Sequence, residues 1–473
     1  MERQSETEYT PGNPLFFALT TMGDAISYQN FSFLIFTFYY AVIGLNVIYM
    51  SLGFIAWSLW NSLNDPIIGL ISDRTKTRWG RRIPFIVGSF IPLSAMMILI
   101  WTPPFWNLNW SYWYFLGIIV LWDTIYTTNS LNMTSLFPEM YQTEDDRAKA
   151  NNFRQIFIIL GLLIAFIVPT LIISDLKGET DRTGTIGQYQ LAGILIGVIV
   201  FLCYFIGIRG GAFRERPEFE DDALNVPEWK NAFLHTLKNR YFQIFVIANT
   251  FSWYVFGILT TIAPLYATSV FINPEIPTFL VGILLGFTFI SAAIFVNLWK
   301  YIGNRLGDLR KTWMISLGLL ILGLLPFFLI DNWVIGVGSF FFLGIGIAGS
   351  LYFKDLIMSD IIDEDEIRTG VRREGAYYGV NAFIMRLSII LVFVSIAVVF
   401  SGFGWEQYFG ANVAPQKLED FRLGLRLLFS IFPAVATLLS ILFINFFGLY
   451  GDKLRTVKEK LKELHQTKLD KAA

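Results

Sequence analysis

Apolar residues gather in twelve runs along the chain, and short polar segments separate these runs. A helix that spans a membrane needs roughly 20 consecutive, mostly apolar residues. The pattern therefore predicts an all-α polytopic membrane protein with twelve transmembrane helices. The predicted helices of the first half cover residues 15–43, 47–72, 84–102, 112–136, 151–174 and 188–208, and those of the second half cover 241–270, 277–301, 312–330, 334–360, 375–401 and 421–449.

The longest polar break in this pattern separates the sixth apolar run from the seventh, and it is rich in Glu and Asp. A basic segment follows the second run of each half, at 69–82 and, in degenerate form, at 303–311. Two halves that echo each other are typical of secondary transporters, which bind solute where the repeats meet. We predict two pseudo-symmetric six-helix bundles at 1–208 and 241–449, a cytoplasmic linker at 209–240 and a basic amphipathic cytoplasmic tail at 450–473.

The composition supports a membrane protein along the whole chain. Only 15% of the 473 residues are charged, whereas 54% are hydrophobic; soluble domains carry about 25% charged residues. The net charge of −1 argues against nucleic acid as a partner. The single cysteine, Cys203, excludes an intramolecular disulfide.

The sequence contains no evident cluster of catalytic or metal-binding residues. The histidines, His235 and His465, are far apart, and no group of residues has metal-ligand spacing. No nucleophile–base set or phosphate-cradling loop stands out either. We therefore expect no enzymatic activity, no cofactor and no structural metal. The expected partners are the lipid bilayer and a small-molecule solute, and the expected state is a monomer.

Positive charge is concentrated on one predicted side of the membrane. The loops at 73–83 and 302–311 and the C-terminal tail are basic, whereas the loops at 103–111 and 271–276 carry almost no charge. Short cytoplasmic loops collect Lys and Arg, so we expect a multi-pass protein of the cell membrane with both termini in the cytoplasm. The tail spaces its apolar residues at helical intervals, which fits either an amphipathic helix on the inner leaflet or a solvated helix.

Five short blocks resemble a known family. N-D-P-I-I-G at 64–69, P-E-M at 138–140 and D-D-R-A-K-A-N-N-F-R at 145–154 lie in the first half. S-D-I-I-D-E-D-E at 359–366 and R-R-E-G-A-Y-Y-G at 372–379 lie in the second. With the basic loop before residue 83, they resemble the major facilitator superfamily and, more narrowly, its glycoside–pentoside–hexuronide:cation symporters, the melibiose-permease-like group. The resemblance implies secondary transport of a sugar-like solute, with Na+ or H+ as a coupling ion.

The resemblance also implies a cation site, and this sequence departs from it. The family has carboxylates at the positions of Asn61 and Asp65, which share one helix face, and a further acid at the position of Ser130. Two of these three acids are neutral oxygen ligands here. Sodium coupling, proton coupling through Asp65, and transport without coupling therefore all stay open, as does a role for Asp65 in bracing its helix.

Three charged residues at predicted bilayer depth align with the family's sugar site. Asp24 matches its substrate acid, Arg154 its sugar-site arginine, and Arg386 stands where the family commonly has lysine. A charge at this depth is costly and usually marks a solute or ion pathway. A guanidinium group can hold a carboxylate, sulfonate or phosphate in two-point contact, so the two arginines suggest an anionic or sugar-acid solute.

Asp123, Tyr126 and Ser130 fall on one helical stripe at spacings of three and four. The family usually has a small or neutral residue at the position of Asp123. Either the helix-four acid has been relocated outward to this position, or Asp123 neutralises Arg154 or Arg386. We therefore assign Asp123 and Tyr126 to the substrate site with the three residues above.

Asp73, Arg81 and Arg82 resemble the superfamily's cytoplasmic gate, in which loop charges hold the halves in one state. The alternative is a solvated basic loop that only obeys the charge rule for topology. Lys354, late in the tenth predicted helix, fits a side chain that extends to the lipid headgroups or a gate pair with an acid of the second or fourth helix.

Three functions fit these observations. The first is a secondary active transporter that moves a sugar, glycoside or sugar-acid-like solute by alternating access. The second is a transporter of the same fold that moves a lysophospholipid or another amphiphile, with Arg386 binding the phosphate. The third, of another class, is a non-transporting membrane receptor or scaffold.

Overall fold

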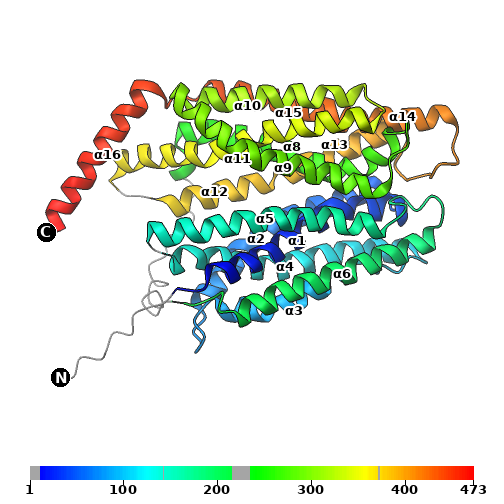
Figure 1. The fold of residues 1–473 in the computed structure, drawn as a ribbon, viewed down its shortest axis with the longest axis horizontal. Helices are drawn as coiled ribbons and strands as arrows, with labels where there is room; N and C mark the ends of the chain where they lie inside the picture. Colours follow the sequence, from blue (N-terminus) through cyan, green and yellow to red (C-terminus); the bar gives the residue numbers. More distant parts are fainter. Residues whose placement is uncertain (1–10, 142, 216–234, 371–372, 473) are drawn as a thin grey trace. The chain divides into compact units, whose positions relative to one another are not determined.

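Helices account for the secondary structure of the described residues, apart from one isolated bridge between Ile272 and Glu275. The chain divides into two compact units, one formed by 1–45 and 59–226 and the other by 46–58 and 227–473. Most of the predicted linker lies outside the described residues. The computed structural model describes residues 11–141, 143–215, 235–370 and 373–472 (Figure 1).

The first unit contains the helices of the first six apolar runs (Figure 1). Polar residues mark where several of them begin: the Asn13, Asn107 and Asp181 side chains each accept a backbone N–H of the first turn, which satisfies donors that the helix leaves unpaired. The elements are α1 (Pro14–Thr37), its π-helical continuation η1 (Phe38–Val42), α2 (Val47–Arg74), α3 (Ile83–Leu99), α4 (Leu108–Met140), α5 (Glu144–Ile172) and α6 (Arg182–Arg209).

The second unit contains the helices of the remaining runs and also residues 47–58 of α2. Asn239, Asp308 and Asn332 cap helix starts in the same way. The elements are α8 (Arg240–Val270), α9 (Thr278–Leu306), α10 (Leu309–Leu324), η4 (Leu325–Phe328), α11 (Trp333–Thr369), α12 (Glu374–Arg386), α13 (Ser388–Gly402), α14 (Pro415–Arg426), η5 (Leu427–Ile431), α15 (Phe432–Asn445) and α16 (Gly451–Ala472).

The predicted spans correspond to these helices but miss some ends. The tenth predicted span stops at 360, whereas α11 continues to Thr369, because the acidic stretch that follows is held by basic partners within the fold. The eleventh is divided at Leu387 into α12 and α13. By length and composition, eight helices of the described residues can cross a membrane, and α3 is a shorter apolar helix. α1, α2 and α4 are long enough but less apolar, since they carry the polar side chains of the site.

Small residues allow helices to approach closely in both units. A Cβ on Gly193 of α6 would overlap the Trp101 ring, just beyond the end of α3, and would lie 2.5 Å from the Met97 carbonyl oxygen of α3. A Cβ on Gly344 of α11 would overlap the Thr288 carbonyl oxygen of α9. Membrane helices gain little from hydrophobic burial against lipid, so such backbone approach contributes much of their packing.

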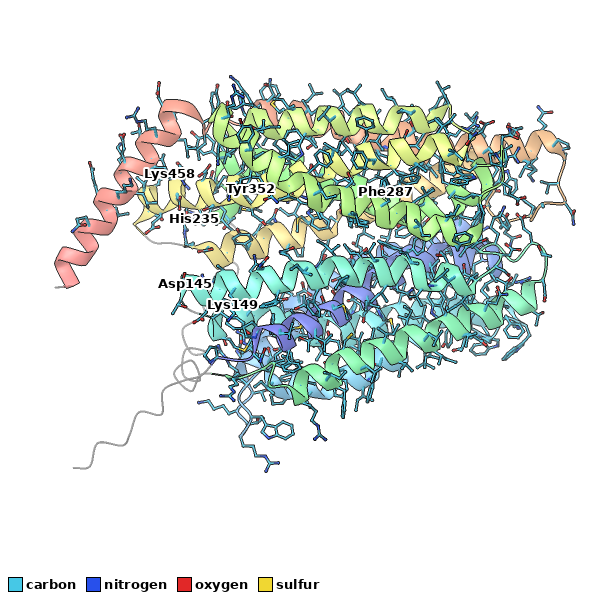
Figure 2. All side chains as sticks on the ribbon, in the orientation of Figure 1. Asp145, Lys149, His235, Phe287, Tyr352 and Lys458 are labelled. Carbon is cyan, nitrogen blue, oxygen red and sulfur yellow. The ribbon has the colours of Figure 1, made fainter. Side chains whose placement is uncertain are left out.

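A lysine of the C-terminal helix α16 forms ion pairs with α11. Lys458 Nζ lies 2.6 Å from Asp360 Oδ1 and 2.7 Å from Asp363 Oδ2, two buried carboxylates near the end of α11 (Figure 2). Burial by itself lowers the pKa of Lys458, but the two hydrogen-bonded carboxylates outweigh it and raise that pKa above its ordinary value. The ammonium is therefore charged at neutral pH. The predicted contact of this helix with lipid stays a prediction.

Replacing Lys458 with alanine should release α16. Two buried carboxylates would lose their cation, at a cost of about 1–3 kcal/mol for groups that water can partly reach. We expect hydrogen exchange of the α16 amides to quicken several-fold. Lys460→Ala, which removes an exposed lysine of the same helix, should leave exchange unchanged. Equal exchange in the two variants would contradict the attachment.

Candidate functional site

A cluster of polar side chains joins α1, α4 and α5 within the first unit. The Tyr126 hydroxyl donates to Asp24 Oδ2 across 3.4 Å, and the Ser130 hydroxyl lies 3.4 Å from the Tyr126 oxygen. Ser130 also interacts with Asp24, and the charge of Arg154 on α5 attracts the Asp24 carboxylate without an ion pair within 4 Å. The Arg154 guanidinium lies over the Phe137 ring, 5.1 Å from its centroid. The structure thus brings together four of the predicted site residues, three assigned to the solute and Ser130 assigned to the cation.

Asp24 keeps one oxygen without a partner. Its Oδ1 is buried and accepts no hydrogen bond from the described residues. A buried polar atom without a partner costs free energy, and ionisable groups at membrane depth usually serve an ion or solute. The free oxygen can accept a hydroxyl of a sugar-like solute, bind a proton or ligate a cation.

Aromatic rings form one wall of this Asp24 cluster. The Trp122 ring stacks on Tyr126, with centroids 5.1 Å apart, and on Phe31, with centroids 3.8 Å apart. Tyr28 packs against Tyr126 at 5.4 Å. Trp122 is fully buried, so its role is to fix the Tyr126 ring rather than to meet a solute.

Asp123 interacts with α2. Asn64 Nδ2 donates to Asp123 Oδ2 at 3.2 Å and to the Asp123 carbonyl oxygen at 3.3 Å. Asn64 was not predicted as a site residue, although it stands beside Asp65 in the N-D-P block. On the same helix Asn61 is buried and Asp65 is half-buried, and both have interaction partners. The acid whose charge acts on Arg154 is Asp24.

Arg386 lies in the second unit as the last residue of α12, directly before the division at Leu387. A basic side chain at a helix C-terminus is favoured by the helix dipole. The Ser58 hydroxyl, on the part of α2 that belongs to this unit, donates to the Arg386 carbonyl oxygen at 2.7 Å. The division therefore leaves backbone carbonyls that side chains must satisfy, as happens where membrane helices are interrupted.

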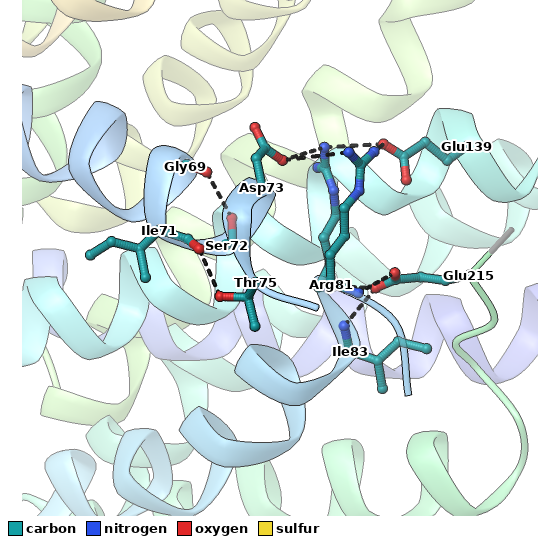
Figure 3. Close-up of polar contacts among 10 residues, drawn as sticks. Gly69, Ile71, Ser72, Asp73, Thr75, Arg81, Ile83, Glu139 and Glu215 are labelled. Carbon is teal, nitrogen blue, oxygen red and sulfur yellow. Dashed lines mark hydrogen bonds and ion pairs between the residues drawn. The ribbon is translucent and has the colours of Figure 1, made fainter. Parts of the chain in front are cut away.

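The predicted gate residues belong to a larger ionic network, the α2–α3 cluster, formed by Asp73, Arg81, Arg82, Glu139 and Glu215 (Figure 3). Arg81 Nη2 lies 2.7 Å from Glu139 Oε1, and Arg82 Nη2 lies 3.0 Å from the same oxygen and 3.2 Å from Asp73 Oδ1. Burial lowers the pKa of Arg82, and Glu139 and Asp73 act against that shift. The loop is therefore an organised, half-buried set of ion pairs.

Glu215, which follows α6, completes the α2–α3 cluster from a distant part of the chain. Its carboxylate accepts the backbone N–H groups of Arg81 at 2.5 Å, of Arg82, and of Ile83 at 2.8 Å (Figure 3). These are unpaired donors at the start of α3, and an anion there is favoured by the helix dipole. Gly80 makes room, since a Cβ there would overlap the Glu215 carboxylate.

Sequence reasoning missed Glu139 and Glu215 as gate residues. Glu139 lies in the P-E-M block, which contributed to the family resemblance, but the sequence suggested no function for this residue. Glu215 appeared only as one of several acids of the linker. Its distinguishing feature, three backbone donors 132–134 residues away in sequence, leaves no mark in a single sequence.

Solved structures similar to this chain show its fold. A crystal structure of a mutant of the nucleoside transporter NupG has a TM-score of 0.68 at 13% identity, and covers 91% of this chain and 99% of that one. A bacterial homologue of the lysosomal transporter Spinster, in an inward-facing and unoccupied conformation, also has a TM-score of 0.68 at 13% identity, covering 94% and 97%. The fold is therefore that of the major facilitator transporters.

A comparison of sequences assigns the chain to a narrower group than the fold does. The family model described as "MFS/sugar transport protein" matches residues 16–450, so the chain belongs to this family. It is 23% identical to the inner membrane symporter YicJ of Escherichia coli over 93% of each chain. It is 21% identical to the isoprimeverose transporter of Lactiplantibacillus pentosus, covering 78% of this chain and 75% of that one. The protein is a multi-pass secondary transporter of the major facilitator superfamily, as the sequence blocks predict.

Tyr126→Phe should weaken solute uptake and spare the fold. Phenylalanine keeps the stack on Trp122 and removes the hydroxyl that joins Asp24 to Ser130. One lost hydrogen bond is worth about 1 kcal/mol, so we expect uptake at low solute concentration to fall about three- to tenfold with an unchanged melting temperature. Tyr114→Phe is the control. Tyr114 also lies on α4, and its hydroxyl donates to the Leu99 carbonyl oxygen at the end of α3. A fall in uptake of equal size in both variants would contradict a role for the Asp24 cluster in binding the solute.

Glu215→Ala should destabilise the first unit by leaving the start of α3 without its acceptor. The loss of such a cap costs about 1–2 kcal/mol, which lowers the melting temperature by about 2–8 °C. Glu215→Gln, which keeps one acceptor oxygen, should fall between Ala and the native protein. Glu179→Ala removes a carboxylate from a loop ion pair with Lys177 and serves as the control. An unshifted Glu215→Ala melting curve would refute the capping role.

Proposed function

We propose that the protein moves a sugar, glycoside or sugar-acid-like solute across the membrane by alternating access, and that the Asp24 cluster binds this solute. The observation that carries the proposal is the half-buried Asp24 carboxylate, with the Tyr126 and Ser130 hydroxyls beside it, the charge of Arg154 acting on it, and its Oδ1 unpartnered among the described residues. Carboxylate, guanidinium and hydroxyl groups together recognise the hydroxyls of a sugar. The isoprimeverose transporter among the relatives supports a sugar-like solute.

The coupling ion belongs to the same proposal. Asp24, with its free oxygen, and Asp65, the one carboxylate retained from the family's three cation positions, are the acids that can take up H+ or ligate Na+. Asn61 and Ser130 supply neutral oxygen ligands only. Two neutral positions out of three favour a proton over sodium, since a proton needs a single carboxylate whereas sodium needs several oxygens.

The α2–α3 cluster supports a gating role for Asp73, Arg81 and Arg82, with Glu139 as the acid on α4 to which both arginines turn. The basic loops of the two halves support a cytoplasmic position for these loops and for both termini. We propose a monomer that acts in the cell membrane and moves its solute without altering it chemically, as the transport family and the symporter among its relatives support.

The test is uptake by the purified protein in proteoliposomes. Vesicles should accumulate a radiolabelled sugar, glycoside or sugar acid, faster with an inward proton gradient than with a sodium gradient, and Asp24→Asn should abolish the uptake. Melting temperatures in detergent identify the ligand first, because a ligand that binds only the folded state raises them. Stabilisation by lysophospholipid alone would favour an amphiphile transporter, and binding of a sugar without any uptake would favour a receptor.

A further inference from the structure

The C-terminal helix α16 has an arrangement of charge that binding of a solute does not explain. Helical spacing places its apolar side chains on one stripe, formed by Leu454, Val457, Leu461 and Leu464. Lysines lie on both sides of this stripe, and acids lie on the opposite face of the helix. The lysines are Lys453 and Lys460 on one side and Lys458 and Lys462 on the other, and the acids are Asp452, Glu459 and Glu463. An apolar stripe between two rows of lysines is typical of a helix that lies in the surface of an anionic membrane.

The rest of the second unit covers this stripe only in part. No residue among 451–464 is fully buried, and each residue of the stripe is half-buried. Lys453, Lys460 and Lys462 are exposed, and they form no ion pair within 4 Å in the described chain. The helix therefore keeps both apolar surface and positive charge available for a further partner.

The start of α16 lies close to the end of a membrane span. The last span ends at Asn445 and α16 begins at Gly451, so these ends are at most roughly 20 Å apart. Phe446 and Tyr450, which lie between them, are exposed, and tyrosine is enriched at the membrane–water interface. Arg310 holds this turn, since its Nη1 donates to the Asn445 carbonyl oxygen at 3.0 Å and its guanidinium lies 3.8 Å from the centroid of the Tyr450 ring. The stripe therefore begins within reach of the lipid headgroups, at the end of the second unit where α10 begins (Figure 1).

Contact with lipid and contact with α11 compete for the same face of α16. Lys458 borders the stripe, and it is the lysine that pairs with Asp360 and Asp363 of α11. A helix that places its stripe in the membrane surface must turn this face away from α11 and give up both ion pairs. Lipid phosphates can replace them, because the Lys458 side chain is 43% exposed and a phosphate accepts the same charge-assisted hydrogen bond as a carboxylate.

We propose that an anionic phospholipid surface is the partner of α16, and that α16 exchanges α11 for this surface when such lipid is present. The stripe then enters the interface, and the lysines beside it bind lipid phosphates. Asp360 and Asp363 lose their cation in that state, so the end of α11 responds to the lipid composition of the membrane. The proposal does not depend on which solute is transported.

The test follows one position of the stripe in the full chain. Leu461→Cys in a Cys203→Ser background carries a nitroxide label, and single copies are placed in nanodiscs of phosphatidylcholine with increasing phosphatidylglycerol. Collision of the label with oxygen reports lipid, and collision with a nickel chelate reports water. We expect the ratio of oxygen to nickel collisions to rise about threefold as the anionic lipid is added. A label at Thr456→Cys, which lies on the exposed face, should keep its ratio.

Two sets of variants separate the role of the exposed lysines from that of the docking on α11. Replacing the three exposed lysines of α16 by glutamine (K453Q, K460Q, K462Q) should remove most of the rise. The matched control, which replaces three exposed lysines elsewhere in the unit (K238Q, K300Q, K311Q), should not. Asp360→Asn with Asp363→Asn keeps every cation of α16 and removes its docked partner, so the ratio should rise at a lower phosphatidylglycerol content than in the native protein.

Melting curves establish that each variant is folded. The lysine variants change exposed side chains, so they test the proposal even where the aspartate variant does not fold. An equal ratio with and without phosphatidylglycerol, or an undiminished rise in the folded lysine variant of α16, overturns the proposal. Shielding of the label that appears only when two copies share a disc also overturns it, because that result assigns the stripe to a second copy of this chain.

Discussion

The Asp24 carboxylate is the charge on which the site in the interior of the first unit depends. It lies on α1, accepts the Tyr126 hydroxyl of α4 and is attracted by the more distant guanidinium of Arg154 on α5. A charge in apolar surroundings costs several kcal/mol, and an opposite charge recovers much of that only if the remaining donors and acceptors are also satisfied. Here the satisfaction is incomplete, because one Asp24 oxygen has no partner among the described residues. α1, α4 and α5 therefore converge on a carboxylate that is still able to bind a further group.

Much of this arrangement could be predicted from the sequence, for identifiable reasons. An apolar run predicts a membrane helix because lipid forces every backbone group to be satisfied within its own helix. The resemblance to the family supplied Asp24 and Arg154 as site residues. Contacts between segments far apart in sequence could not be predicted. The pairing of Asn64 with Asp123 depends on the rotation of α2 against α4, and no proline or glycine announces the division of α12 from α13 at Leu387. Helix ends were missed where tertiary ion pairs extend a helix beyond its apolar part, as in α11.

The two units solve the same electrostatic problem with different residues. In the first, an acid at the end of α4, Glu139, is neutralised by arginines of the α2–α3 loop. In the second, two acids near the end of α11, Asp360 and Asp363, are neutralised by Lys458 from the C-terminal helix. The counter-charge therefore comes from within the bundle in one half and from an appended helix in the other. The duplicated plan has kept the position of the acid and changed the source of its partner.

Gly80 has a consequence for how the sequence can change over time. Its φ of +97° and the overlap of an added Cβ with the Glu215 carboxylate mean that a side chain at residue 80 and the carboxylate at residue 215 compete for the same volume. A side chain at residue 80 would meet two obstacles at once: the strained backbone, which persists whatever stands at residue 215, and the volume that the Glu215 carboxylate fills. Residue 80 is thereby restricted to glycine both by its own backbone and by an acid that the chain supplies four helices later.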